Sequence, residues 1–596
     1  MSKIVSVIKA VLPGDQVIND HKSLRALLTK SLPVVQRIHA CANDHVLFLG
    51  PYKDLEECPF ENCGLPRYYT TPLGQKKPVN VFRTIPLLDQ LRLVYRDPIR
   101  SVAMRLYPAC CTDANRDDVE ISDITGSIGF KETVFDSGFM TDPRNPILIM
   151  GADGVNPWAI NRVAKYGLWP YMFSLVNYER SIRNKHENLI LGGLVSGHVY
   201  IDGKRTTRSA KSLNCYTQYF LDQINDLNGS EVVDVSYEPG SAHATFNMRA
   251  ILLGTVTDFD GLGKLTNRVK AGSVQCCPKC NISGTWYKAC KTRVFGQHRR
   301  YLSPSDPIRN DPTYGQPEHR PPPRVRTMEQ ALRHGTLAAR LKHSKPKQRH
   351  TEHVTKTGLY DLSPLATHPG YNIVDRSFLD LMHIIKNVVD LHLMKRMGNR
   401  AALPSLPTSK RKHKTAAQLS KMSASAVVKW KASCAARDLE VEELNVVRQQ
   451  IIEDDAKWII SDADKISSHE RMRNLVCPME YYNRKPIWEF AGTWDTNDWQ
   501  HFFERYGIFA LYGCLDDSRF NVVVELFEIL SVLSKYSQTR NELKALKQQT
   551  IRLLVEFERT GPVQEQTVVF HLLIHLVEQA IRWGPPVCSW LVSRVF

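Results

Sequence analysis

The sequence predicts an α/β region followed by a largely helical region. Short apolar runs bounded by Gly, Pro or polar residues predict buried strands, because they are too short for lone helices. A stretch with apolar residues at helical spacing predicts a helix between the last two strands. The predicted strands span 147–152, 169–177, 189–196 and 250–256, the helix spans 209–227, and helices dominate beyond 424, most clearly at 522–557.

An aspartate follows two of the predicted strands. Asp153 ends the run Ile147-Leu-Ile-Met-Gly-Ala, and Asp258 ends the run Ala250-Ile-Leu-Leu-Gly-Thr-Val-Thr. Strand ends are where α/β sheets place chemistry, and paired carboxylates hold the divalent ions of phosphoryl-transfer enzymes. Each residue alone is also explained by a cap or turn at the strand end. Together the two acids predict a shared Mg²⁺ (or Mn²⁺) site.

The order of these elements has a precedent among known folds. Three strands, a helix and a further strand match the first half of an RNase H-like fold. In that fold the first and fourth strands lie side by side, so Asp153 and Asp258 are expected at one edge of the sheet.

A structural zinc site is predicted from two distant pairs of residues. Cys277 and Cys280 have the C-x-x-C spacing of half a tetrahedral site. His571 and His575, at i and i+4 inside an apolar run, lie on one helix face and can supply the other two ligands. The alternative is a core helix with two hydrogen-bonded histidines. The largely helical region between these two pairs would be an insertion in the α/β core. If zinc binds, it ties both ends of this insertion to the core.

A second Cys/His group lies near the N-terminus. Cys41 with His45, and Cys58 with Cys63, form a candidate Cys₃His zinc knuckle, although the spacing is looser than in strong zinc-finger signatures. The alternative is four unrelated residues.

Later segments are less specific. Residues 303–353 are rich in Pro, Arg, Lys and His, which predicts a mobile basic linker that contacts phosphate or is simply solvated. Residues 378–397 have apolar spacing typical of a helix, and the basic cluster at 410–414 is compatible with nuclear import or DNA contact.

Charge and cysteine content restrict the class of protein. The 596-residue chain exceeds a single core, so several domains are expected. Its net charge of +17 predicts a polyanionic partner, nucleic acid before membrane. The apolar run at 4–12 is interrupted by Lys9 and has no cleavage-site signature, which argues against a secretory signal. Fourteen cysteines, several at zinc-like spacing, indicate reduced thiols and the cytosol or nucleus.

Several uncommon strings occur in one order along the chain. They are Asp153-Gly-x-Asn-Pro, Phe246-Asn-x-Arg-Ala-x-Leu-Leu, Thr257-Asp258-Phe, Cys277-x-x-Cys280, His298-Arg-Arg-x-Leu and Leu379-Asp-x-Met-His383-x-x-Lys-Asn-Val. In this order the chain resembles, from about residue 41 to 590, the transposases of CACTA-type (En/Spm, Tnp2-like) DNA transposons. The Cys and His spacing also resembles the zinc-pinned catalytic core of the V(D)J recombinase.

The resemblance implies an RNase H-like fold in which Asp153 and Asp258 are the first two members of a DDE triad. It implies Mg²⁺-dependent DNA strand cleavage and transfer, assembly as a homo-oligomer on DNA, and a nuclear location. The expected organisation is an N-terminal Cys/His region (1–100), the first part of the core (101–265), the C-x-x-C half-site with the basic linker (266–350), a helical insertion (351–560) and a return helix (561–596).

The family pattern breaks near the end of the sequence. There the triad's glutamate is expected a few residues after Trp590, but residues 591–596 contain no acid. The expectation is a C-terminally truncated chain with incomplete catalysis. Asp380 and Glu578 are the alternative third acids.

Two other functions remain open. One is a non-catalytic zinc-containing DNA-binding or interaction protein derived from a transposase. The other is an RNase H-like nuclease unrelated to transposition, which needs no long helical insertion.

Overall fold

The computed structural model describes residues 33–106, 115–156, 167–399, 416–419, 422–475, 487–490, 494 and 496–589. The chain divides into two compact units. Unit 1 comprises Met1–Tyr107 and Asp142–Leu252, and unit 2 comprises Pro108–Thr141 and Leu253–Phe596. The apolar run at 4–12, the basic cluster at 410–414 and the segment 590–596 lie outside the described residues.

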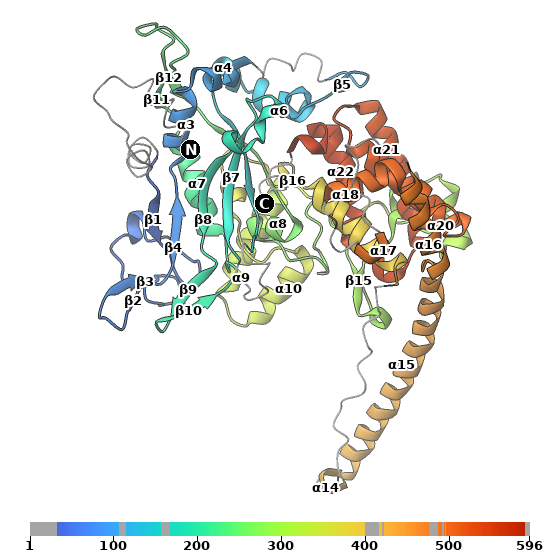
Figure 1. The fold of residues 1–596 in the computed structure, drawn as a ribbon. Helices are drawn as coiled ribbons and strands as arrows, with labels where there is room; N and C mark the ends of the chain where they lie inside the picture. The colour runs from blue at the N-terminus through green and yellow to red at the C-terminus, as the bar shows by residue number, and fades with distance from the viewer. Residues whose placement is uncertain are drawn as a thin grey trace. The chain divides into compact units, whose positions relative to one another are not determined.

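Unit 1 contains an antiparallel set of strands in the order β1-β4-β8-β7-β6 (Figure 1). Every residue of β6 is buried, as its unbroken apolar run predicts. The predicted strands at 147–152, 169–177 and 189–196 are therefore confirmed with small changes at their ends. The strands are β1 (Gln36–His39), β4 (Val81–Thr84), β6 (Ile147–Ala152), β7 (Trp169–Leu175) and β8 (Ile190–Val195).

Helix α7 (Asn214–Asp226) supplies an aromatic core to unit 1. The ring centroid of Phe220 lies 5.3 Å from that of Phe173 on β7 and 5.9 Å from that of Phe82 on β4. Gly192 allows this close approach, because a Cβ there would lie 2.6 Å from Phe173 and 2.8 Å from Phe220. The helix expected at 209–227 is thus present but begins five residues later, at Asn214.

Three hairpins and three further helices complete the described part of unit 1. The hairpins are β2 (Tyr68–Thr70) with β3 (Lys76–Pro78), β9 (His198–Ile201) with β10 (Lys204–Thr207), and β11 (Ser230–Val233) with β12 (Thr245–Met248). The helices are α3 (Leu87–Tyr95), α4 (Pro98–Leu106) and α6 (Arg180–Arg183).

Unit 2 contains a parallel strand pair, β13 (Ile251–Thr257) and β16 (Ser377–Leu379). The register joins Thr255 to Ser377 and Thr257 to Leu379. On α22 (Val568–Trp583), the Gln579 side chain accepts a hydrogen bond from Leu379 N at 2.7 Å and donates one to Leu379 O at 3.2 Å. The Gln579 side chain thus forms the hydrogen bonds with Leu379 N and O that a further strand beside β16 would otherwise form.

Helices make up most of the described part of unit 2, and the long helices α20, α21 and α22 pack in one hydrophobic core. Two short antiparallel strand pairs accompany them: the long-range pair of β5 (Glu120–Ile121) with β17 (Gln538–Thr539), and the hairpin of β14 (Thr285–Tyr287) with β15 (Thr292–Val294). The helices are α5 (Ile128–Phe130), α8 (Phe259–Leu265), α9 (Met328–Lys342), α10 (Lys347–Thr357), α11 (Pro364–Thr367), α12 (Leu381–Ile385), α13 (Lys395–Met397), α14 (Ala416–Leu419), α15 (Ala424–Ala456), α16 (Asp462–Asn474), α17 (Ile487–Phe490), α18 (Thr496–His501), α19 (Gly507–Leu511), α20 (Asp517–Leu533), α21 (Arg540–Thr560) and α22.

The stretch 303–353, expected to be a mobile basic linker, contains hydrogen-bonded turns and helices. Buried Arg309 donates hydrogen bonds to the carbonyls of Leu302, Glu318 and Arg320 at 2.7–3.0 Å. A capping box formed by Thr327 and Gln330 then begins α9. A guanidinium that satisfies several carbonyls orders the backbone where apolar side chains are scarce.

Two predicted helices, at 378–397 and 522–557, are each divided into more than one element in the structure. The helix expected at 378–397 is preceded by strand β16 and continues from α12 into a π-helix, η11 (Lys386–Met394). The stretch 522–557 is divided into α20 and α21, because Thr539 caps the second helix by accepting a hydrogen bond from Glu542 N at 3.1 Å. In the parts of the chain that the structure describes, no helix combines the length and apolar character needed to cross a membrane.

Candidate metal centres and strand-end acids

The N-terminal Cys/His residues converge within unit 1. Ligand atoms of Cys41, His45, Cys58 and Cys63 all lie within 4.8 Å of one another. The Cys41 sulfur is 3.7 Å from the Cys63 sulfur and 3.9 Å from His45 Nδ1, which is 3.8 Å from the Cys58 sulfur. The predicted grouping of these four residues is therefore observed, with His45 as its one histidine.

A tight turn between Cys41 and His45 is anchored by Asp44. This residue has a positive φ of 58° and a buried side chain. Its carboxylate accepts hydrogen bonds from Arg208, from Tyr216 Oη at 2.6 Å and from Lys211 N at 2.8 Å. The turn also brings Asn43 N to 3.2 Å from the Cys41 sulfur. The knuckle is thus attached to the core of unit 1 by charge-assisted hydrogen bonds.

The second Cys/His group converges within unit 2 and is wholly buried. Its members, Cys277, Cys280, His571 and His575, also place their ligand atoms within 4.8 Å of one another. The two sulfurs are 3.7 Å apart, Cys280 Sγ is 3.2 Å from His571 Nε2, and the Nε2 atoms of the two histidines are 3.1 Å apart. Both histidines project from one face of α22, as their i, i+4 spacing predicts.

Both groups fit a tetrahedral ion such as zinc. Bonds of about 2.3 Å to sulfur and about 2.0–2.1 Å to nitrogen separate tetrahedral ligand atoms by about 3.3–3.8 Å. The distances above, 3.1–3.9 Å, cluster around that range. Each group could therefore hold a metal ion without a large rearrangement.

Further side chains orient the histidines of the second group. His571 Nδ1 lies 3.1 Å from His298 Nε2, and the other nitrogen of His298 contacts the carboxylate of Glu558. His575 Nδ1 lies 2.7 Å from Glu578 Oε2. A carboxylate behind His575, and a histidine backed by a carboxylate behind His571, fix the two rings and leave Nε2 of each directed at the metal.

The pKa shifts of two of the four residues favour the ligand forms, and those of the other two oppose them. Burial and the neighbouring Cys277 raise the pKa of Cys280, and although burial alone would lower the pKa of His575, the charge of Cys277 raises it to about 9. Burial lowers the pKa of His571 to about 4, so its ring is neutral at ordinary pH. For Cys277 burial acts in the opposite sense, but the hydrogen bond from Cys280 and the charge of His575 outweigh it and hold the pKa well below its ordinary value. A neutral imidazole and a thiolate are the ligand forms that zinc requires.

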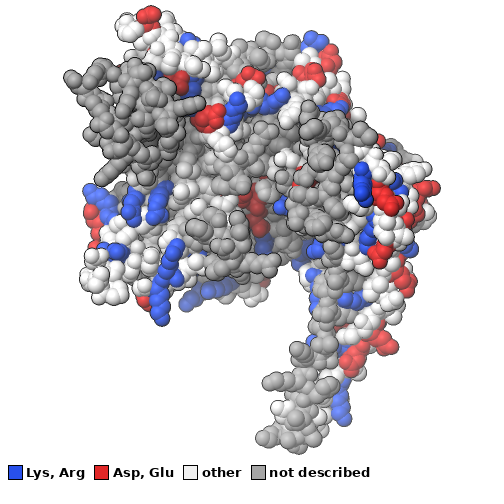
Figure 2. Space-filling view, in the orientation of Figure 1, with Lys and Arg blue, Asp and Glu red and all other residues white. Residues whose placement is uncertain are grey.

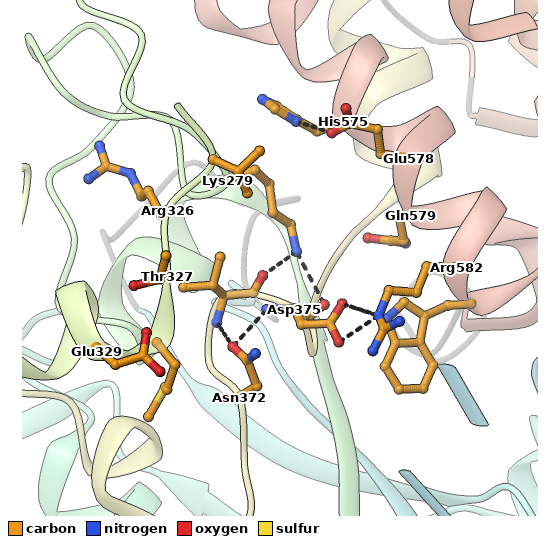
Figure 3. Close-up of a pocket in the computed structure, with 14 residues that line it drawn as sticks. Lys279, Arg326, Thr327, Glu329, Asn372, Asp375, His575, Glu578, Gln579 and Arg582 are labelled. Atoms are coloured by element: carbon orange, nitrogen blue, oxygen red, sulfur yellow. Dashed lines mark hydrogen bonds and ion pairs between the residues drawn. The ribbon is translucent and has the colours of Figure 1, made fainter. Parts of the chain in front are cut away.

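A cavity of about 440 Å³ lies beside the second group, with Glu578 in its wall (Figure 3). Fully buried Lys279 donates hydrogen bonds to backbone carbonyls of residues 374–377 at 2.7–3.4 Å. Asp375 accepts hydrogen bonds from Arg582 Nε at 2.8–3.0 Å. Because these charged groups already have partners within the protein, we assign this cavity no ligand.

Asp258 follows β13, as predicted, and caps helix α8. One of its oxygens accepts a hydrogen bond from Gly261 N at 2.6 Å, so the capping role considered in the sequence analysis is real. Asp380 follows β16 in the same way, accepting from Met382 N at 3.0 Å and lying 2.6 Å from His383 Nδ1. Both acids therefore follow the ends of neighbouring parallel strands.

The acids of unit 2 also share a small cavity. Asp258, Asp380 and His383 line a space of about 20 Å³, which holds about one water-sized sphere. Asp153, in unit 1, follows the end of β6, is half-buried and accepts a hydrogen bond from Gly154 N at 2.7 Å. The sharing of one ion by Asp153 and Asp258 remains a prediction.

Two features of the sites were not predicted from the sequence. Glu578 was considered as a third catalytic acid, but it lies on the metal-binding helix α22, where its carboxylate contacts His575 and also Lys547 Nζ of α21 at 2.7 Å. The contact of His298 with His571, and that of Glu558 with His298, were also missed. A signal existed for each, since Glu578 stands three positions after His575 and His298 lies in one of the quoted strings.

A family model matches part of the chain. Residues 129–336 match the family model described as transposase family tnp2. This range contains Asp153, Asp258, Cys277, Cys280 and His298. No curated protein matches the chain.

Proposed function

Because residues 129–336 are a region of the tnp2 transposase family, we propose that the chain is a DDE-type transposase of a CACTA-like element. It would cut DNA at the element ends and join the freed ends to target DNA. The match covers both aspartates that the sequence singled out, Asp153 and Asp258. A non-catalytic DNA-binding role is an outcome of the test below.

The observation that carries this proposal is the pairing of two strand-end acids. Thr257 and Leu379 are directly paired, so Asp258 and Asp380 follow equivalent positions of parallel strands. Carboxylates that leave neighbouring strand ends are suited to hold divalent ions for phosphoryl transfer. We therefore assign Asp380, rather than Glu578, as the additional acid of the site. His383 acts as a positioning residue through its contact with Asp380.

Mg²⁺ bound there would polarise the phosphodiester and stabilise the charge that develops on it. In this scheme Asp258 and Asp380 are metal ligands and not general bases. We propose that Asp153 completes the set. This needs β6 to stand beside β13, which is the strand arrangement of an RNase H-like core. The antiparallel strands β8-β7-β6 and the parallel pair β13–β16 are the components that such a core requires.

Zinc would have a structural role in both units. In unit 2, Cys277 and Cys280 follow the α8 segment, and His571 and His575 lie on the helix whose Gln579 binds the backbone of β16. An ion between them would hold that helix against the segment that follows Asp258. In unit 1, the Cys₃His knuckle would hold the turn that Asp44 anchors.

DNA is the partner that the charge favours. The formal net charge is +17, and exposed basic residues include Lys76 and Lys77 on β3 and Lys204 and Arg205 on β10. Figure 2 shows Lys and Arg side chains over this part of unit 1. Such residues bind phosphates with little sequence preference. We propose that the chain acts on nuclear DNA as a homo-oligomer.

The test is nicking of supercoiled plasmid by the purified chain with Mg²⁺ or Mn²⁺. Asp258→Asn and Asp380→Asn should each reduce nicking at least a hundredfold, whereas plasmid binding should persist. Asparagine still caps a helix, so these changes remove charge and keep the cap. Asp516→Asn, which changes the capping aspartate of α20, is the matched control and should nick normally.

Two results would contradict the proposal. Nicking that survives Asp258→Asn would show that the strand-end acids are not the site. Zinc-loaded chain that binds plasmid but never nicks it would favour the non-catalytic DNA-binding alternative.

A further inference from the structure

A further cavity, of about 510 Å³, also has Asp258 in its lining. Asp258 lines both this cavity and the small one that it shares with Asp380. We infer that the larger cavity seats one nucleotide of a single DNA strand and that Lys386 binds its phosphate. The placement of this seat beside reacting DNA rests on the proposed function, whereas its capacity to bind a nucleotide does not.

One wall of the cavity is built by α12 and the π-helix η11 that continues it. His383, Lys386, Asn387 and His392 all line the cavity. In a regular α-helix, positions nine apart point in opposite directions, because each residue turns the helix by about 100°. The wider turn of η11 therefore explains how His392 faces the same space as His383. Wide turns of this kind are frequent at functional sites.

The cavity lining contains two permanent cations, Lys386 and Arg293, and two acids, Asp258 and the exposed Asp260. Lys386 is exposed and forms no ion pair with any residue that the structure describes. Arg293 donates hydrogen bonds to the carbonyls of Gly272 at 3.0 Å and Gly284 at 2.9 Å, which are uncharged acceptors. This contrasts with the cavity of Figure 3, where Arg582 is paired with Asp375. Lys386 and Arg293 form no ion pair among the described residues, so both side chains are available to contact a phosphodiester.

The cavity also offers apolar surface for a base or sugar. Phe259 is half-buried in its lining, and Leu391 is 46% exposed. Bases bind single-strand sites by lying on such side chains, with little dependence on sequence. A volume of about 510 Å³ is in the range of small-ligand pockets. It does not admit a duplex, so the occupant is an unpaired nucleotide.

Asp258 lines both cavities, so a strand seated in the larger cavity would continue toward the smaller one. A nucleotide seated in the larger cavity has its phosphate near Lys386, and the next phosphodiester reaches toward Asp258 and Asp380. The seat thus selects an unpaired strand at the point of reaction. Duplex DNA bound elsewhere on the basic surface would not fill it.

The experiment measures binding of a fluorescein-labelled oligonucleotide of about eight nucleotides by anisotropy, without added Mg²⁺. Lys386→Ala should weaken binding about tenfold and reduce the salt dependence by about 0.7 in log–log slope. Lys386→Arg should restore most of the affinity. Lys395→Ala is the matched control, because Lys395 is exposed on α13 and does not line the cavity. Zinc content is measured for every variant to confirm folding.

The outcomes separate this inference from the proposed function. Equal oligonucleotide affinity for Lys386→Ala and Lys395→Ala overturns the seat, even if plasmid nicking depends on Asp258. Affinity that depends on Lys386 in a chain that never nicks supports the seat and rejects the catalytic proposal. A duplex of the same length should compete at least tenfold more weakly than the single strand, and equal competition would also overturn the inference.

Discussion

His298 Nε2 lies 3.1 Å from His571 Nδ1, on the side of the ring away from the metal-binding nitrogen. His298 is itself buried, and its other ring nitrogen contacts the carboxylate of Glu558. His298 and Glu558 thus orient the ligand His571, although neither of them is one of the four metal-binding residues.

We therefore expect His298→Ala to weaken zinc binding at the second group by about 10- to 100-fold. The measurement is competition with a chromophoric chelator, which reports affinity for each bound ion. His319→Ala, which changes an exposed histidine nearby in the sequence, is the control and should leave both affinities unchanged. Wild-type zinc affinity in His298→Ala would show that the relay does not support the ligand.

Metal analysis should find two zinc ions per chain, one for each Cys/His group. Replacing His571 and His575 together with Ala should remove one ion, and Cys41→Ser with Cys58→Ser should remove the other. Loss of either ion should lower the thermal midpoint, because metal binding stabilises the folded ligand arrangement. Two retained ions in the double-histidine variant would mean that these rings are only core residues.

Gly254→Ala tests the close contact between Gly254 on β13 and Phe378 on the neighbouring strand β16. A Cβ at position 254 would lie 2.2 Å from Phe378 Cε2, and that ring packs against Trp583. We expect a loss of about 1–3 kcal/mol in unfolding free energy. In Gly126→Ala the added Cβ is 3.7 Å from Ile121, so denaturant unfolding of that control should change little. Similar midpoints for both variants would contradict the packing described for β16.

Stability should depend on pH through Glu318. The hydrogen bond from Arg320 lowers the pKa of Glu318 to about 2, below the usual unfolded value of about 4.3. The contribution is therefore complete above about pH 5 and is lost as pH falls toward 2. Arg320 is well exposed, so the pair contributes only about 1 kcal/mol. Glu318→Gln should melt below wild type at pH 7, with a gap that narrows toward pH 3.

The control for this change is Glu352→Gln, on the exposed side of α10. Its melting temperature should follow wild type across the same pH range. A gap for Glu318→Gln that stays constant down to pH 3 would show that ionisation of this residue is not the source of its effect.

The strands and the two Cys/His groups were predictable because their signals are local. An apolar run such as β6 is buried on both faces whatever surrounds it, and the i, i+4 spacing of His571 and His575 fixes one helix face. The pairing of Cys277 and Cys280 with those histidines needed only the requirement of zinc for four ligands. No comparable rule links His298 to Glu558, because that contact depends on tertiary packing.

The ordered stretch around Arg309 was not predictable for a related reason. Composition indicates whether a segment can bury apolar surface, but not whether a guanidinium finds several carbonyls. The π-helix η11 was also missed, since apolar spacing at 378–397 is compatible with an ordinary helix. The pairing of Thr257 with Leu379 is a long-range contact that no local pattern specifies.

The distance along the chain between Cys280 and His571, 291 positions, has a consequence for synthesis. At about 5–20 residues per second, the cysteine pair leaves the ribosome roughly 15–60 s before its histidines. Throughout that interval the two thiols lack half of their ligand set. Zinc uptake at this group therefore reports that translation has passed residue 575, and an interrupted chain would be released with its cysteines open to oxidation.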